Sequence, residues 1–333
     1  MSRIFTEGFE MGTVDTSVWS GNIKLKTGAV VRPGSGVYSA NFTSLNTYRE
    51  LGASFSEFYL RTAFRIDSNN NALVGWNNAG TVLGYIYFTA ATRKITLYVG
   101  NSSLVATGTK ILSLATWYLL EVYVKISDAG GVITLKIDGM QDCTFSGDTK
   151  PGADTNIDRI RFFNNYNPEC YWDDIALNDT VSAVDNSWCG DGHVITLAPN
   201  ANGDLSQLLG SDGDSTDNYL LVDETPQDGD TTYVEGSAVD EKDLYNLAAS
   251  GLLTNSIIKE VWVEAVCKDT VGAGGLLALV LKTNSMEYAS ADIALGISYA
   301  ILRGTNHPIN PNTSAAWTIG ELDALQAGPK TRS

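Results

Sequence analysis

The segment of residues 117–139 constrains the fold more than any other part of this chain, because its polarity alternates over two consecutive stretches. Apolar side chains recur at every second position of the first stretch: Tyr118, Leu120, Val122, Val124 and Ile126. This is the period of a strand with one buried face. Residues 128–131, Asp-Ala-Gly-Gly, then turn the chain, since adjacent glycines accept the positive φ of a tight hairpin. The alternation resumes at Ile133 and ends at residues 138–139, Asp-Gly, so the segment is predicted to form a β-hairpin.

Further strands are expected throughout residues 1–180, because the same alternation recurs between turn signals. They are predicted at residues 58–66, 85–88, 95–99, 160–163 and 171–177. The Trp-Tyr-x-Leu-Glu-Val run from Trp117 and the Asp-Gly that ends at Gly139 resemble a hairpin of the concanavalin A-like and laminin G-like jelly rolls. The resemblance implies a jelly-roll sandwich in which the opening residues 7–10 pair near the final strand at residues 171–177.

The charge balance changes beyond residue 180. Residues 181–333 carry 7 Lys and Arg against 21 Asp and Glu, which gives −14 of the chain's net charge of −16. Residues 181–187 are small and polar and are predicted to form a linker. Short strands are expected beyond it at residues 194–197, 219–222, 258–267, 276–281 and 298–303. The predicted fold is therefore all-β: a concanavalin A-like jelly-roll sandwich over residues 1–180, then a second, smaller, acidic β-rich domain over residues 188–333 with a short C-terminal helix.

The C-terminal helix is predicted from a capping-box pattern. Thr318 and Glu321 have the spacing at which each side chain accepts from the other's backbone N–H, and Gly-Pro at residues 328–329 is a stop signal. A helix of about ten residues is marginal in water unless its apolar face is packed. The candidate packing residues are therefore also candidate oligomer-interface residues: Trp317, Ile319, Leu322 and Leu325. Packing in cis against the same domain is the alternative, and it requires no partner.

Several function classes are disfavoured by composition. The chain has no apolar run of the length that spans a membrane, and residues 1–10 lack the apolar core of a signal peptide, which predicts synthesis in a cytoplasm. Its acidity repels phosphate backbones, so nucleic-acid binding is not expected. The Glu-x-Asp-x-x-Glu pattern of related jelly-roll glucanases is broken by Gln326 and by Asn246, where the second glutamate would stand. We therefore expect no enzymatic activity and no cofactor except calcium.

Calcium is expected in one acidic loop. Asp212, Asp214, Asp217 and Asn218 place four oxygen side chains in this loop, with the three aspartates as the candidate ligands, and hard cations are held by oxygen ligands. The spacing is not that of an EF-hand. The alternative is that these side chains are solvated turn residues, for which Asp is also favoured.

Two predicted loops have the composition of a carbohydrate site. Trp76, Asn77 and Asn78 form one, and Asn165 with Tyr166 belongs to the other. An aromatic platform beside amide side chains is typical of lectin sites, and loops often carry function. The alternative for Trp76 is a core position, which tryptophans in sandwiches often occupy.

The chain also resembles virion proteins of tailed bacteriophages in the amino-acid sequence of three segments: residues 188–192, 197–204 and 315–328. That resemblance implies a non-enzymatic structural protein on the virion surface, such as a decoration, fibre or tail accessory protein, made in the host cytoplasm. Its expected partners are other capsid or tail proteins, further copies of itself, since particle symmetry repeats its parts, and a host surface glycan. The alternatives are a free carbohydrate-binding, lectin-like module and a polysaccharide-degrading enzyme with a divergent site.

Overall fold

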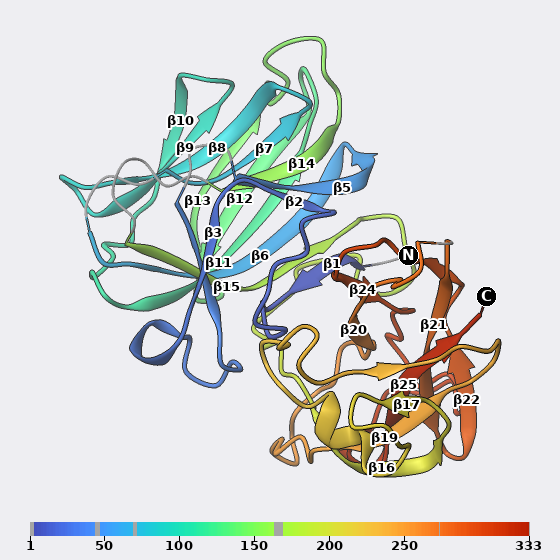
Figure 1. Cartoon of the computed structure of the whole chain (residues 1–333). Coiled ribbons are helices and arrows are strands. Elements are labelled where there is room, and N and C mark those ends of the chain that lie inside the picture. Colours follow the sequence, from blue (N-terminus) through green and yellow to red (C-terminus); the bar gives the residue numbers. More distant parts are fainter. Residues whose placement is uncertain (1–2, 44–46, 69–71, 163–168, 273, 333) are drawn as a thin grey trace. The chain divides into compact units, whose positions relative to one another are not determined.

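The computed structural model describes residues 3–43, 47–68, 72–162, 169–272 and 274–332. In these residues nearly all of the regular secondary structure is β-strand, with one short α-helix near the C-terminus (Figure 1). It divides into two compact units, the first made of Met1–Glu10 and Thr16–Ile195, the second of Met11–Asp15 and Thr196–Ser333. The predicted all-β fold with a β-rich second part and a C-terminal helix is confirmed.

The first unit contains two antiparallel sheets. The eight-stranded sheet has the order β13-β12-β11-β6-β15-β4-β3, with β1 also paired to β15. Its strands are β1 (Arg3–Glu7), β3 (Ile23–Lys26), β4 (Ser39–Phe42), β6 (Glu57–Ile66), β11 (Trp117–Lys125), β12 (Gly131–Ile137), β13 (Met140–Gly147) and β15 (Cys170–Asn178). A 3-10 helix, η1 (Gly28–Val30), lies between β3 and β4.

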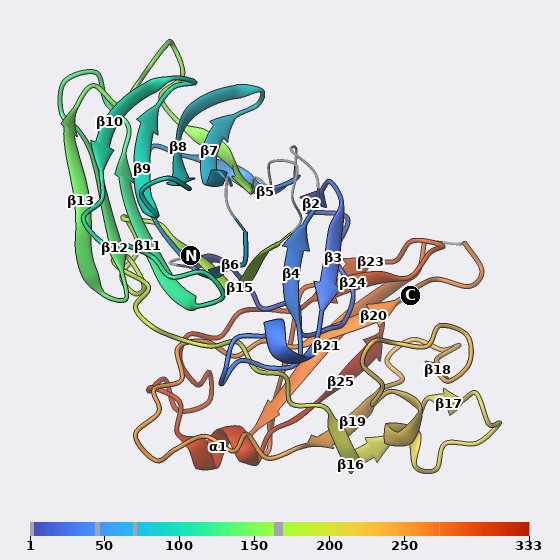
Figure 2. The ribbon, with the colours of Figure 1, turned by 90° about the vertical axis from the view of Figure 1, so that its left-hand side faces the viewer.

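The seven-stranded sheet of the first unit has the order β10-β9-β8-β7-β14-β5-β2 (Figure 2). Its strands are β2 (Trp19–Ser20), β5 (Thr47–Phe55), β7 (Ala72–Asn78), β8 (Thr81–Thr89), β9 (Lys94–Val99), β10 (Ser103–Thr107) and β14 (Ile157–Phe162). The two sheets share one core, because their inward side chains meet.

The predicted hairpin is β11 and β12. Leu120 pairs with Ile137 and Val124 with Ile133, and all four side chains are buried. Positive φ angles at residues 138–139, 52° and 76°, turn the chain into β13, as the Asp-Gly pair predicts. β11 also pairs along its whole length with β6, so the hairpin joins the eight-stranded sheet at its centre.

Aromatic side chains join the two sheets. Phe42 and Trp172 come from the eight-stranded sheet and Phe162 from the seven-stranded one, and all three are fully buried. The Phe162 ring centroid lies 4.8 Å from that of Phe42 and 5.0 Å from that of Trp172. Large rings in contact contribute both buried area and favourable ring geometry. Packing of this cluster fixes the position of the seven-stranded sheet against the eight-stranded one. It therefore also fixes which residues of the seven-stranded sheet point outward.

An opening strand pairs with the last strand of the first unit, as the resemblance to jelly rolls implies, but it is β1 (Arg3–Glu7) and not residues 7–10, of which only Glu7 belongs to it. Phe5 of β1 pairs with Leu177 of β15, and Glu7 pairs with Ile175.

The first unit extends further along the chain than the predicted boundary at residues 181–187. Trp188 packs edge-on against Tyr59, with 5.2 Å between ring centroids, and the Lys136 ammonium lies 3.7 Å from its centroid. The Gly190 N–H donates to Glu121 at 2.7 Å. Residues 188–195, which the sequence places in the second domain, therefore pack on the first unit. The change of composition at residue 181 marks a change of charge and not the end of packing.

The second unit contains a six-stranded sheet and two strand pairs. The sheet has the order β16-β19-β25-β21-β22, with β23 paired to β21; the pairs are β17-β18 and β20-β24. The sheet strands are β16 (Pro199–Ser206), β19 (Asp243–Leu247), β21 (Leu276–Thr283), β22 (Met286–Ala289), β23 (Ile293–Ala294) and β25 (Gln326–Thr331). The remaining elements are β17 (Leu209–Gly210), β18 (Val234–Glu235), β20 (Glu264–Cys267), β24 (Ala300–Arg303), the 3-10 helix η2 (Asn218–Leu221) and α1 (Ile319–Asp323). Nowhere in the described residues is there a helix with the length and apolar character needed to cross a membrane.

The C-terminal helix is shorter than predicted. The capping box is present, with the Glu321 N–H donating to Thr318 Oγ1 at 3.2 Å and the Thr318 N–H donating to Glu321 Oε2 at 2.9 Å. The helix ends at Asp323, however, and Gly328 and Pro329 lie inside β25 and do not stop a helix. A Cβ on Gly328 would lie 2.1 Å from the backbone oxygen of Asp243, so only glycine allows strands β25 and β19 to come this close.

The residues predicted as an oligomer interface lie mostly inside the second unit. Trp317, Leu322 and Leu325 are 6%, 7% and 3% exposed and form one core cluster with Val261 and Leu281. These three side chains pack in cis, and a neighbouring subunit cannot reach them in this fold. Only Ile319 of the four is partly exposed.

Candidate functional site

A row of large side chains crosses the outer face of the seven-stranded sheet. Successive residues of a strand point to opposite faces, and Val74, Ile86, Leu97, Ile160 and Phe162 point into the core. The residues between them point outward. Strand register pairs five of these in sequence, one from each strand: Tyr48, Arg161, Gly75, Tyr85 and Tyr98. We call this set the tyrosine row.

The two tyrosines at one end of the row stack on each other. The ring centroids of Tyr85 and Tyr98 are 4.7 Å apart, and the rings are parallel within 3°. The Tyr85 hydroxyl donates to the Asn101 backbone oxygen at 3.2 Å. Burial, followed by the nearby Tyr98 and Tyr87, raises the pKa of Tyr85 above its usual value. At neutral pH this phenol is therefore protonated, and it is a hydrogen-bonding group and not a base.

Cationic and amide groups accompany the tyrosines. The Arg159 guanidinium carbon lies 4.6 Å from the Tyr48 ring centroid, and Arg159 Nη2 is 3.1 Å from a Glu50 carboxylate oxygen. Arg161 is half-buried, and burial lowers its pKa. Asn77 is 3% exposed and pairs in register with Arg159. Among the described residues, no group completes a hydrogen bond to its Oδ1 atom.

The outward face thus combines flat aromatic surface with guanidinium and amide groups. Tyrosine offers a large apolar area with a polar end, and arginine offers several N–H donors in a fixed plane. Such a combination suits a ligand that has both apolar faces and many hydroxyl groups.

The carbohydrate prediction at Trp76 is wrong, while its neighbour lies on the candidate face. Trp76 is 1% exposed, because it pairs with Ile160 in the interior of β7 and points into the core. Asn77, one residue further along, points to the opposite face. Asn78 donates to Asp154 at 3.1 Å. Asn165 and Tyr166 lie outside the described residues.

A second polar cluster lies on the eight-stranded sheet. Asp174 is fully buried with a left-handed φ of 50°, and Arg32 contacts it at 2.7 Å. Ser35 Oγ lies 2.7 Å from Nδ1 of His193 and also donates to Asp174, whose carboxylate lies 3.3 Å from the same ring nitrogen. A Ser-His-Asp triad needs the serine and the aspartate on opposite ring nitrogens. This arrangement therefore anchors the segment of residues 188–195 and does not activate the serine.

The acidic loop of the second unit keeps its three aspartates apart. Asp212, Asp214 and Asp217 are all exposed. Asp214 accepts from the Thr216 N–H at 2.7 Å, and Asp217 accepts from Asn202 at 3.0 Å. The described part of the chain contains no group of three or more His, Cys, Asp or Glu side chains arranged to hold a metal ion. Calcium binding by these three carboxylates alone stays a prediction that the geometry does not support.

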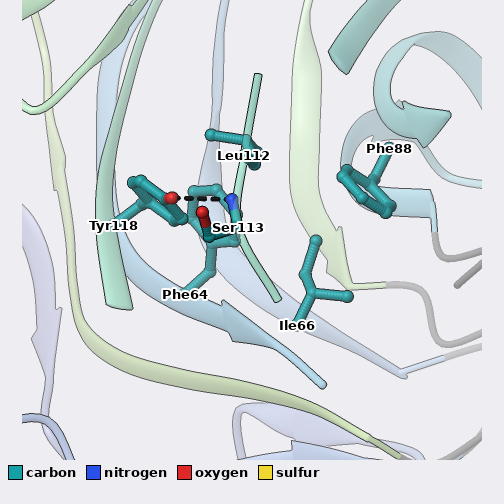
Figure 3. A pocket seen from close by; sticks show the side chains of 6 residues that line it. All are labelled: Phe64, Ile66, Phe88, Leu112, Ser113 and Tyr118. Atoms are coloured by element: carbon teal, nitrogen blue, oxygen red, sulfur yellow. Dashed lines mark hydrogen bonds between the residues drawn. The ribbon is translucent and has the colours of Figure 1, made fainter. Parts of the chain in front are cut away.

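A small space inside the first unit is not a ligand site. Its lining is almost entirely apolar (Figure 3): Phe64, Ile66, Phe88, Leu112, Ser113 and Tyr118. The Ser113 N–H donates to the Tyr118 hydroxyl across one side at 2.8 Å. The space has no room for a water molecule, so it is a packing gap in the core.

Comparison with known proteins gives a likeness of fold. No protein-family model matches the chain, and no curated protein sequence matches it. An endo-β-1,4-glucuronan lyase from the fungus Trichoderma reesei aligns with 12% identity over 56% of this chain and 100% of its own, with a TM-score of 0.41. A sialidase from Trypanosoma rangeli aligns with 15% identity over 47% of this chain and 27% of its own (TM-score 0.35). A Bacillus subtilis protein of unknown function with a galectin-like fold aligns with 10% identity over 54% and 96% (TM-score 0.39).

These likenesses correct one prediction. The expectation that the chain is not an enzyme rested on missing motifs, and it is contradicted by the presence of a polysaccharide lyase and a sialidase among the similar structures. The activities belong to those proteins. A missing glucanase motif does not by itself exclude catalysis.

Proposed function

We propose that the first unit binds a glycan chain across the outer face of its seven-stranded sheet. The tyrosine row carries this proposal: five strands present three tyrosines and an arginine in register on one face, with Asn77 and Arg159 in the next row. Adjacent strands lie about 4.8 Å apart, so the row is roughly 19 Å long. That length suits an extended chain of sugar rings better than a single small molecule.

The chemistry of the row supports the same ligand class. Sugar rings have apolar faces that pack on aromatic side chains and hydroxyl groups that need donors and acceptors. Asn77 is 3% exposed, and no described group completes a hydrogen bond to its Oδ1 atom, which is unfavourable for a buried acceptor. A ligand hydroxyl reaches this atom only where a neighbouring side chain moves aside.

We expect the whole protein to bind at least one glycan on an array that spans neutral and uronic-acid-containing oligosaccharides. The double substitution Tyr85→Ala/Tyr98→Ala should weaken that binding by about tenfold or more, equivalent to about 1.4 kcal/mol. Biolayer interferometry on the glycan that binds measures the change. The matched control is Tyr171→Ala, a tyrosine on the eight-stranded sheet, which should leave the dissociation constant unchanged.

Two results would count against this proposal: no glycan bound by the wild-type protein, or an equal loss in the Tyr171→Ala control. Thermal melting of each variant shows whether it is folded. Assay of new reducing ends in the same glycan solutions distinguishes a binding module from an enzyme that cleaves the chain it holds.

The resemblance to tailed-phage virion proteins suggests where such binding would be used. We propose that the protein lies on the virion surface and contacts a host surface glycan from there. The support for this location is the sequence resemblance. Antibodies against the chain should label purified virions in negative-stain micrographs. Particles that carry no label, with the free protein recovered in the supernatant, would leave a free lectin-like module or enzyme as the better description.

A further inference from the structure

The acidic loop of the second unit contains a buried amide whose orientation is fixed. Asn218 is fully buried, and its Nδ2 group donates to the Leu208 backbone oxygen at 2.9 Å and to Asp243 Oδ2 at 2.6 Å. Both partners are acceptors, so exchanging the amide oxygen and nitrogen would lose both bonds. The Oδ1 atom therefore points away from Asp243, and within the described structure it accepts no hydrogen bond.

A second oxygen lies close to this unpaired acceptor. Asn218 Oδ1 and Asp212 Oδ1 are 2.9 Å and 2.5 Å from the position that a Cβ on Gly210 would occupy. The two oxygens are therefore neighbours beside Gly210, and a Leu221 methyl carbon lies 2.6 Å from the same position. Asp212 Oδ1 receives only a long contact of 3.4 Å, from the Asp214 N–H. Two acceptors that border one point repel each other unless a donor or a positive charge lies between them.

We propose that this loop binds a hard divalent cation, with Ca²⁺ as the probe, between Asp212 and Asn218. Carboxylate and amide oxygens are the ligands that calcium prefers, and the full charge of Asp212 favours a cation over a bridging water. Asp214 and Asp217 add negative charge on the same loop, and residues 205–235 contain no Lys or Arg to compete. The sequence places Asn218 in the same loop as the three aspartates, and in this proposal Asn218 supplies the inner ligand while Asp214 and Asp217 supply only charge.

The test is calorimetric titration of CaCl₂ into the chelator-treated whole protein. We expect one site with a dissociation constant on the order of 10⁻⁴ to 10⁻³ M, since only one carboxylate contacts the ion. The substitution Asp212→Asn should weaken binding by at least about tenfold while it preserves the shape of the loop. Asp223→Asn, an exposed position in the same unit with the same change of charge, is the control and should bind as the wild type does.

Thermal melting gives an independent readout. Excess calcium should raise the melting temperature of the wild type and of Asp223→Asn, because a ligand that binds only the native state stabilises it. The same excess should leave Asp212→Asn unchanged. Absence of calcium heat in the wild type would overturn the proposal, and so would equal affinities in the wild type and Asp212→Asn.

Discussion

Replacing Arg32 with alanine is expected to destabilise the protein by about 3 kcal/mol, because it leaves a buried carboxylate without its cation. Arg32 Nη1 lies 2.7 Å from Asp174 Oδ2, and the Asp174 side chain is fully buried. Burial acts to raise the pKa of Asp174, but hydrogen bonds from His193 and Ser35 and the charge of Arg32 outweigh it and hold that pKa below its usual value. The hydrogen bonds from His193 and Ser35 remain in the variant. The expected loss in the free energy of unfolding is therefore at the lower end of the range of about 3–5 kcal/mol for a broken buried ion pair.

The matched control for this substitution is Lys110→Ala. Lys110 also forms a close ion pair, at 2.6 Å from Asp138, but its side chain is 38% exposed and that of Asp138 is 46% exposed. Exposed pairs contribute about 1 kcal/mol or less, so this variant should differ little from the wild type. Urea denaturation of the whole protein measures both. Similar losses in the two variants would contradict the view that burial of Asp174 makes the Arg32 contact important.

The same contact explains why the boundary of the first unit could not be predicted. Arg32 also donates to the Gly192 backbone oxygen at 2.9 Å and contacts Asp191 at 2.6 Å. These bonds join residues about 160 positions apart. A sequence shows composition and local periodicity, and a salt bridge across that separation leaves no trace in either. The shift from mixed to acidic composition at residue 181 was therefore misleading as a domain boundary.

The first unit was predictable wherever its strands are long and amphipathic. β6, β8, β9, β11 and β12 each carry a clear two-residue alternation, and turn chemistry separates several of them. The second unit was less predictable. β16 contains Pro199 and Gly203, which are typical of turns, yet it pairs with β19. Gly328 and Pro329 likewise lie in β25, where pairing with β19 and β21 outweighs local preference.

The outer face of the seven-stranded sheet was likewise only partly predictable from the sequence. The alternation in Tyr85-Ile-Tyr87 and in Arg159-x-Arg161 indicates outward side chains on each strand. What the sequence does not show is that β14 lies beside β7, more than 75 residues earlier in the chain. The two asparagines that follow Trp76 favour a loop at this position. Pairing on both sides of β7 makes that segment a central strand and turns the tryptophan inward.

The second large effect is expected from pH, through Glu10. Its carboxylate accepts from the Val37 N–H at 2.6 Å and the Tyr38 N–H at 3.3 Å, and its side chain is buried. Burial is the largest influence and raises the pKa of Glu10 to about 7; these two N–H groups act in the opposite direction, and the negative charges of Asp174 and Glu7 raise the pKa further. The native protein therefore keeps a proton on Glu10 at pH values where the unfolded chain has lost it.

The sign of the effect follows from that difference in bound protons. Between pH 4.5, the ordinary value for a glutamate, and pH 7, the folded state binds more protons than the unfolded state, so stability falls as pH rises. The stabilisation that comes from the raised pKa of Glu10 is fully present below pH 4.5 and is lost as the pH rises through 7. The shift corresponds to roughly 3 kcal/mol. Above pH 7 Glu10 is ionised in both the folded and the unfolded state, so the cost of burying its charge no longer changes with pH.

The substitution Glu10→Gln isolates this group, because glutamine has nearly the same shape and carries no ionisable proton. The variant and the wild type should have similar free energies of unfolding near pH 4.5, and above pH 7 the variant should be more stable by up to roughly 3 kcal/mol. Urea denaturation at several pH values measures the difference, from which groups that titrate alike in both proteins cancel. A difference that stays constant from pH 4.5 to pH 8 would show that Glu10 is ionised throughout, with its two N–H contacts strong enough to outweigh burial.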